Sequence, residues 1–107
     1  MKNLKYKLRI LAPAQRELEE IALLHLELVG PNSARKITDR IYSALELLQT
    51  SPNIGISCSD KPLKLDGYRM LVCGNYLCIY RLIDDIVFVY HIVDGRMNYP
   101  RLMNDLK

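Results

Sequence analysis

Three features that would narrow the function are missing from this sequence: a framework of paired cysteines, a long apolar run and a strong charge of one sign. The three cysteines, Cys58, Cys73 and Cys78, are an odd number without a Cys-x-x-Cys pair or a Cys/His ligand spacing, so neither a disulfide frame nor a zinc site is supported. No apolar run approaches the ~20 residues that a membrane-spanning helix needs, and the first residues lack the apolar segment of a secretory signal. We therefore expect a cytoplasmic protein that needs no membrane, metal or cofactor.

The charge balance and composition are those of an ordinary globular protein. Lysine and arginine number 15 against 12 aspartate and glutamate residues, which gives a net charge of +3. An excess this small permits contact with nucleic acid but does not by itself indicate it. The sequence has no internal repeat, low-complexity tract or linker, so residues 1–107 are expected to form a single domain.

Residues 67–101 carry the features on which the rest of the interpretation depends. Two turn signals divide this stretch: Gly74-Asn75, which tolerates positive φ in tight hairpin loops, and Asp84-Asp85, whose side chains bond the local backbone. The segments that follow the two turns, 76–82 and 86–93, are rich in tyrosine, isoleucine and valine, which favour strands. We predict a three-stranded meander with a basic, aromatic tail.

Alternation along these strands sorts their side chains onto two faces. The face predicted to be the core is apolar or aromatic throughout: Tyr68, Met70, Val72, Tyr76, Cys78, Tyr80, Leu82, Ile86, Phe88, Tyr90 and Ile92. The opposite face mixes charged and aliphatic side chains: Arg69, Leu71, Cys73, Leu77, Ile79, Arg81, Val87, Val89 and His91. Such a face either binds a partner or is covered by a neighbouring element, and a single β-bulge would change the parity. The sequence leaves these alternatives open.

The first part of the chain predicts a strand and a helix. Residues 5–11 alternate between apolar and basic side chains, as a half-buried edge strand does. A helix is expected from Ala12 to the break at Gly30-Pro31. Its apolar stripe includes His25, which we expect to pack at the edge of the core instead of acting as a ligand or base.

A second helix is expected to follow at once, capped by Asn32 or Ser33 and ending near Thr50. So short a connection makes the two helices an antiparallel hairpin, and residues 53–66 are expected to be a surface loop. The order β-α-α-β-β-β predicts an α+β fold of two layers, in which the helical hairpin packs on one face of a four-stranded antiparallel sheet. The sequence does not show which strand lies beside the first.

Several short motifs lie along this framework. They are Ala14-Gln15-Arg16-Glu17-Leu18, Gly67-Tyr68-Arg69, Tyr76, Tyr80-Arg81, Val93-Asp94-Gly95-Arg96 and Asn98-Tyr99. Together with the length and the order of elements, they make the sequence resemble the RelE/ParE superfamily of toxins from bacterial type II toxin–antitoxin systems, over nearly the whole chain. The resemblance implies growth inhibition, a role such as plasmid stabilisation, and a cognate antitoxin as partner, with the toxin as a homodimer or in a heterotetramer with that antitoxin.

The resemblance leaves the target open, because this superfamily carries two chemistries on one fold. RelE-like members cut messenger RNA on the ribosome, as mRNA interferases, whereas ParE-like members poison DNA gyrase and need no nuclease site. A third alternative is an inactive remnant retained for complex formation. Whether the protein is an enzyme therefore depends on which alternative holds.

By this resemblance, a nuclease would take its catalytic groups from basic residues on the open sheet face and a tyrosine near the C-terminus. The first basic position falls on Arg69, which keeps its charge. The next two fall on Leu71 and Leu77, where the cation is lost. Arg81, His91 and Tyr99 could form a substitute set. If the protein is a nuclease, the candidate catalytic residues are thus Arg69, Arg81, His91, Arg96 and Tyr99.

The tail favours the ParE-like alternative. The segment from Asp94 to Leu102 resembles the C-terminal pattern of ParE-like toxins more closely than the nuclease tail. Arg96, Tyr99 and Arg101 are thus the expected target-binding residues, although Tyr99 could instead anchor the tail over the sheet. The expected antitoxin-binding residues form a patch on the open sheet face: Arg69, Leu71, Leu77, Ile79, Arg81 and Val89.

Overall fold

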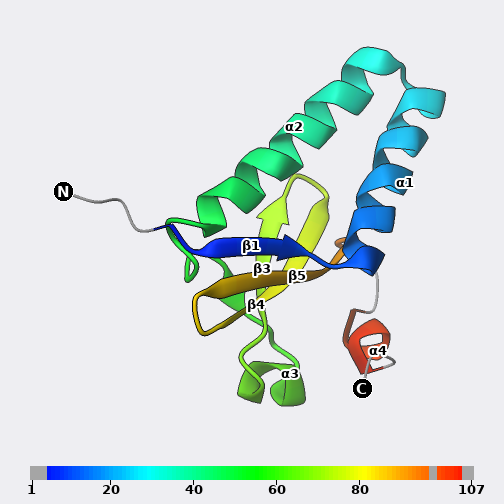
Figure 1. The fold of residues 1–107 in the computed structure, drawn as a ribbon. Coiled ribbons are helices and arrows are strands. Elements are labelled where there is room, and N and C mark those ends of the chain that lie inside the picture. The colour runs from blue at the N-terminus through cyan, green and yellow to red at the C-terminus, as the bar shows by residue number, and fades with distance from the viewer. Residues whose placement is uncertain (1–4, 97–98, 105–107) are drawn as a thin grey trace.

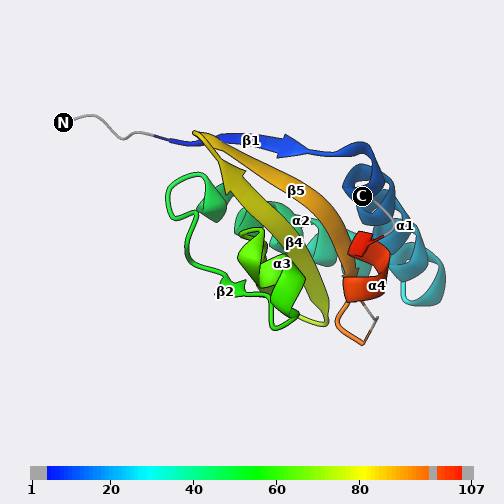
Figure 2. The same cartoon turned by 90° about the horizontal axis from the view of Figure 1, so that it is seen from below.

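The computed structural model describes residues 5–96 and 99–104 of the chain. Two long helices pack on one face of a sheet, and two short helices lie on its other face (Figures 1 and 2). In chain order the elements are β1 (Lys7–Ile10), α1 (Ala12–Leu28), α2 (Pro31–Leu48), β2 (Ile56–Ser57), α3 (Lys61–Leu65), β3 (Arg69–Cys73), β4 (Tyr76–Ile83), β5 (Ile86–Asp94) and α4 (Tyr99–Asn104).

The sheet has five strands in the order β1-β5-β4-β3-β2, and β1 runs parallel to β5 while the other neighbours are antiparallel. The α+β class and the helical hairpin on one sheet face are confirmed, but the prediction of a four-stranded antiparallel sheet is wrong. A parallel pair needs a long connection, and the helices and the meander between β1 and β5 supply it. The additional strand, β2, lies in the segment that was expected to be a surface loop.

The two long helices begin and end close to where the sequence places them. Ala14, Leu18 and Ile21 form the buried stripe of α1, with the spacing of three and four residues that an amphipathic helix requires. Gly30 has a φ of 136° and no side-chain cap, and α2 begins directly at Pro31. The predicted cap at Asn32 or Ser33 is therefore wrong, because proline already fits the first helical position.

The predicted core face is correct for β4 but wrong for β3 and for most of β5. Two-residue turns pair odd with even positions, so Cys73 lies opposite Tyr76 and Leu82 lies opposite Val87. Leu71 and Cys73 therefore pack with the helices, in place of Tyr68, Met70 and Val72. The register then shifts at Tyr90, which has no partner on β4. This β-bulge returns Ile92 to the helix side, as predicted.

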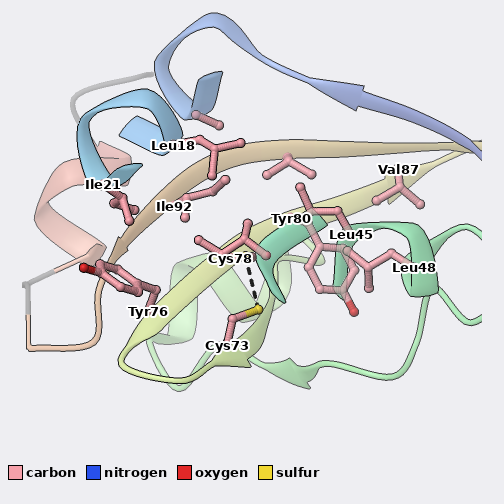
Figure 3. Close-up of a cluster of buried hydrophobic side chains, with 13 residues drawn as sticks. Leu18, Ile21, Leu45, Leu48, Cys73, Tyr76, Cys78, Tyr80, Val87 and Ile92 are labelled. Carbon is pink, nitrogen blue, oxygen red and sulfur yellow. Dashed lines mark hydrogen bonds between the residues drawn. The ribbon is translucent and has the colours of Figure 1, made fainter. Parts of the chain in front are cut away.

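The sheet therefore has a hydrophobic cluster on each face. The first lies between the sheet and the long helices (Figure 3): Ala14, Leu18, Ile21, Ile41, Leu45, Leu48, Cys73, Tyr76, Cys78, Tyr80, Val87, Val89 and Ile92. The second lies between the other face and the short helices: Cys58, Leu63, Tyr68, Ile79, Val93 and Met103. The sequence left open whether this face binds a partner or is covered by neighbouring elements. At this cluster, the short helices α3 and α4 cover it.

The segment before β2 is fastened to the sheet through Tyr80. The Tyr80 hydroxyl donates a hydrogen bond to the Pro52 carbonyl oxygen at 2.7 Å and accepts one from the Gly55 N–H at 3.0 Å. A Cβ atom at Gly55 would lie 2.6 Å from both the Met70 carbonyl oxygen and the Tyr80 hydroxyl. Glycine is therefore required for the close approach of this segment to the sheet.

Neither α1 nor α2, nor any other helix in the described part of the chain, has the length and apolar character that crossing a membrane requires.

Candidate functional site

Arg69, the first candidate catalytic residue, is engaged with the loop before β2. Its Nε and Nη2 atoms donate to the Gly55 carbonyl oxygen at 3.1 and 2.8 Å, and Nη2 also donates to the Asn53 carbonyl oxygen at 3.1 Å. Three hydrogen bonds to backbone carbonyls hold the guanidinium in place against this loop. The half-buried side chain therefore stabilises the loop.

Arg81 lies between two tyrosines on the sheet face away from the long helices. Its Cζ atom is 4.5 Å from the centre of the Tyr68 ring and 5.5 Å from that of Tyr90, and its Nη2 donates to the Tyr90 hydroxyl at 2.9 Å. Stacking of a guanidinium on aromatic rings is favourable electrostatically. Burial raises the pKa of Tyr68, an effect that the Arg81 charge partly opposes.

His91 is buried against α1, with 4% of its surface exposed. Its Nδ1 lies 2.8 Å from Glu17 Oε2 and 3.0 Å from Oε1, and Oε1 also accepts a hydrogen bond from the Ile92 N–H at 2.9 Å. Nε2 is buried and has no hydrogen-bond partner among the described residues. A general base must reach the proton that it abstracts, and neither ring nitrogen is accessible in this arrangement.

The five candidate catalytic residues therefore each have their own separate hydrogen-bond partners. Within the described ranges, no hydrogen bond joins any two of Arg69, Arg81, His91, Arg96 and Tyr99. The same part of the chain contains no group of three histidine, cysteine, aspartate or glutamate side chains that could hold a metal ion. Around Arg81, the structure instead brings together basic and aromatic side chains on the outer face of the sheet.

A row of basic and aromatic side chains crosses the outer face of the sheet. Arg9 on β1 pairs with Phe88 on β5, and Phe88 pairs with Arg81 on β4. Residues paired across neighbouring strands share a face, and the rings of Tyr90 and Phe88 lie 6.5 Å apart on it. Phe88 and Tyr90 are half-buried, and arginine beside such aromatic rings can stack on nucleic-acid bases or contact acidic groups. This row was not predicted from the sequence, because strand alternation had placed Phe88 on the core face.

The tail presents two cations at the surface. Arg96 donates to the Asp94 carboxylate through Nε and Nη2, each at 3.0 Å, while 92% of its side chain stays exposed. This bidentate pairing holds the pKa of Asp94 down at about 2. Arg101 lies exposed on α4, whereas Tyr99 packs against the second cluster and its hydroxyl is 3.3 Å from Ser59 Oγ. Of the predicted target-binding residues, Arg96 and Arg101 are thus on the surface, and Tyr99 anchors the tail.

The residues of the expected antitoxin-binding patch lie on two faces of the sheet and do not share one surface. Leu71 and Val89 pack in the first cluster, beneath the long helices. Ile79 is fully buried in the second cluster, and Leu77 packs at its edge. The physical reason is the altered parity of β3 and β5. Leu77 alone of these four lines a hollow, of about 400 Å³, together with Val72 and Arg96.

Glu17 is the residue with a clear structural role that the sequence analysis missed. Glu17 faces β5, where its carboxylate bonds His91 and the Ile92 N–H. Its place on the helix could have shown this, because it lies one turn before Ile21, on the same side of α1.

Comparison with known proteins identifies the family of the chain. The family model described as the ParE toxin of the type II toxin–antitoxin system parDE matches residues 8–99. No protein with a curated description matches the sequence.

Three solved structures share the fold. The chromosomal ParDE toxin–antitoxin system of Pseudomonas aeruginosa matches with a TM-score of 0.71 and 22% identity, over 87% of this chain and 98% of that one. Escherichia coli toxin RelE, as an arginine mutant in the free state, matches with a TM-score of 0.65 and 17% identity, over 96% of this chain and 99% of that one. The toxin–antitoxin complex RelBE2 of Mycobacterium tuberculosis matches with a TM-score of 0.59 and 19% identity, over 84% of this chain and 98% of that one.

Proposed function

Because the chain belongs to the family of ParE toxins of type II toxin–antitoxin systems, we propose that it arrests bacterial growth by binding DNA gyrase and that a cognate antitoxin neutralises it. The protein would act in the cytoplasm, where its target lies. RNA cleavage would play no part in its toxicity.

The observation that carries this proposal is the structural use of the candidate nuclease groups. RNA cleavage needs a base for the 2′-hydroxyl and cations for the developing phosphorane charge, all directed at one phosphate. Here the imidazole of His91 is buried against Glu17, and the guanidinium of Arg69 is bonded to loop carbonyls. Recognition of a protein target requires no such convergence, so this arrangement favours gyrase binding.

We assign the target contact to Arg96 and Arg101, the two exposed cations that follow β5. The Asp94 carboxylate bonds the Arg96 guanidinium on one edge and so restricts its rotamers before any partner binds. A restricted side chain loses less conformational entropy on binding than a free one. This preorganisation fits a recognition residue at an exposed position.

For the antitoxin, we propose the hollow formed by the β3–β4 turn and the end of β5 as the binding site. Its wall includes Val72, which is 61% exposed, and Leu77. Apolar anchors of a partner bind such hollows, and Arg96 at the rim offers a contact for an acidic group. The toxin–antitoxin complexes named among the structural matches support an antitoxin as the partner.

A ribosome-dependent ribonuclease is the second candidate function. The row of Arg9, Phe88 and Arg81 supports it, because aromatic rings beside arginine suit single-stranded RNA. In that case the outer sheet face, and not the tail, would contact the target.

Two double variants separate the candidates in a growth assay. Arg96→Ala/Arg101→Ala removes two exposed cations from the tail, and Lys7→Ala/Arg9→Ala removes two from β1, so the charge change is the same. Gyrase binding through the tail predicts that only the tail variant loses toxicity. Loss of toxicity only in the β1 variant would contradict the proposal and support RNA binding on the outer face.

A further inference from the structure

The helical hairpin extends beyond the end of the sheet (Figure 1), and a pocket of about 410 Å³ lies at its far end. The pocket is lined by His25, Val29, Asn32, Ser33, Lys36, Ile37 and Arg40. None of these is acidic, and Lys36 and Arg40 carry positive charge. This pocket shares no lining residue with the hollow or the tail assigned above.

Lys36 and Arg40 place two positive charges on one side of α2, one turn apart. No carboxylate forms an ion pair with either of them within the part of the chain that the structure describes. The Arg40 guanidinium lies against the β3–β4 turn, where a Cβ atom added to Gly74 would be 3.4 Å from its Nη1. The absent side chain at Gly74 therefore leaves the space in which the guanidinium lies.

Besides Lys36 and Arg40, the pocket has a polar wall formed by His25 and Ser33, and hydrogen bonds hold these two side chains in place. His25 Nδ1 lies 3.0 Å from Ser33 Oγ, and its Nε2 lies 3.0 Å from the Tyr76 hydroxyl oxygen. Tyr76 belongs to the first core cluster, so the imidazole is oriented by a buried residue of the sheet. The hydroxyl of Ser33 is held at the pocket wall by the same chain of contacts.

We propose that this pocket binds a phosphate monoester, such as the terminal phosphate of a nucleotide. Arg40 would bond two of its oxygens, Lys36 would contribute a point charge, and Ser33 would donate from its hydroxyl. Val29 and Ile37 form the apolar part of the wall and would contact the organic group that carries the phosphate. The volume lies within the range of pockets for small organic ligands.

The number of donors favours phosphate over carboxylate. A carboxylate has two oxygens, and one arginine can satisfy both of them. The lysine and the serine hydroxyl would then have no acceptor in the same pocket. A phosphate monoester presents three terminal oxygens and up to two negative charges, which matches this donor set.

Titration of the isotope-labelled full chain with AMP, monitored by NMR, tests the proposal. Saturable shifts are expected at His25, Ser33 and Lys36, and adenosine, which lacks the phosphate, should produce none. Arg40→Ala and Lys36→Ala should each weaken AMP binding about tenfold, the equivalent of one charge-assisted hydrogen bond. Arg35→Ala is the matched control, because Arg35 is an exposed cation on the same helix outside the pocket. The affinity of this variant for AMP should stay within about twofold of that of the parent protein.

A second pair of probes identifies the source of the phosphate. If AMP and a short 5′-phosphorylated oligonucleotide compete for the same residues, the pocket accepts the monoester from either source. If only the oligonucleotide produces these shifts, and its unphosphorylated form does not, the ligand is a nucleic-acid end. Equal binding of adenosine and AMP, equal losses in Arg35→Ala and Arg40→Ala, or binding of a glutamate-rich peptide without either phosphate probe would overturn the proposal. Thermal melts of each variant show whether it is folded.

Discussion

The imidazole of His91 lies against the carboxylate of Glu17, with 2.8 Å between Nδ1 and Oε2. The same carboxylate accepts the N–H of Ile92, so one side chain of α1 binds both a side chain and the backbone of β5. β1 pairs with β5 only as far as Val89. Glu17 thus takes the place of a neighbouring strand where β1 has ended, and its contact with His91 is part of the scaffold that joins α1 to β5.

Removal of this carboxylate should destabilise the fold. Glu17→Ala leaves the Ile92 N–H and a buried imidazole without their acceptor, which should lower the free energy of unfolding by about 1–3 kcal/mol. Urea denaturation measures the loss. Glu19→Ala, an exposed position on the same helix, should stay within about 0.5 kcal/mol of the parent protein. Equal stability of the two variants would contradict a role for Glu17 in the scaffold.

The corrected parity of β5 predicts different costs for two large-to-small substitutions. Leu45 is fully buried in the first cluster, so Leu45→Ala should cost about 2–5 kcal/mol. Phe88 is half-buried on the outer face, so Phe88→Ala should cost distinctly less. Chemical denaturation of both variants checks this order, and a Phe88→Ala loss as large as that of Leu45→Ala would place the ring in the core.

Gly55 should not tolerate a side chain. A methyl group there would overlap the Met70 carbonyl oxygen and the Tyr80 hydroxyl, each only 2.6 Å away, so Gly55→Ala should cost about 1–3 kcal/mol through overpacking. The adjacent exposed position serves as control, and Ile54→Ala should cost under about 1 kcal/mol. A thermal melt of Gly55→Ala that matches the parent protein would show that this segment is not held against the sheet.

The Asp94–Arg96 pair should appear in a pH titration. The carboxyl of Asp94 should titrate at about 2 by NMR, because Arg96 bonds the ionised form. A pKa that is lower in the folded state means that the pair stabilises the tail above the ordinary pKa of aspartate, and that this contribution is lost as the pH falls toward 2. Arg96→Ala should return the Asp94 pKa to its ordinary range. An unchanged titration in that variant would show that the pair does not form in solution.

Local pattern predicted the parts of the fold that depend on one element at a time. The stripe of Leu18 and Ile21 on α1 and the alternation of Tyr76, Cys78 and Tyr80 on β4 are confirmed, because periodicity holds within a continuous helix or strand. The alternation did not carry over from one strand to the next with odd and even positions unchanged, because the length of the turn decides which positions pair. The bulge at Tyr90 changed it again.

The short elements and the long-range contacts could not be predicted in this way. β2 has two residues and α3 five, too few to show a period. Glu17 and His91 are 74 residues apart, and their contact depends on β5 lying beside β1, which the sequence left undecided. The candidate catalytic residues were chosen by residue type alone, and their burial and partners depend on the three-dimensional arrangement.

The most direct test of the proposed function is DNA gyrase supercoiling activity in the presence of the purified toxin, with ribosome-bound message incubated in parallel. The account predicts that the toxin blocks supercoiling of a relaxed plasmid, that its antitoxin restores it, and that Arg96→Ala/Arg101→Ala fails to block it, while the message stays intact. Unimpaired supercoiling together with cleaved message would contradict the account and identify a ribonuclease.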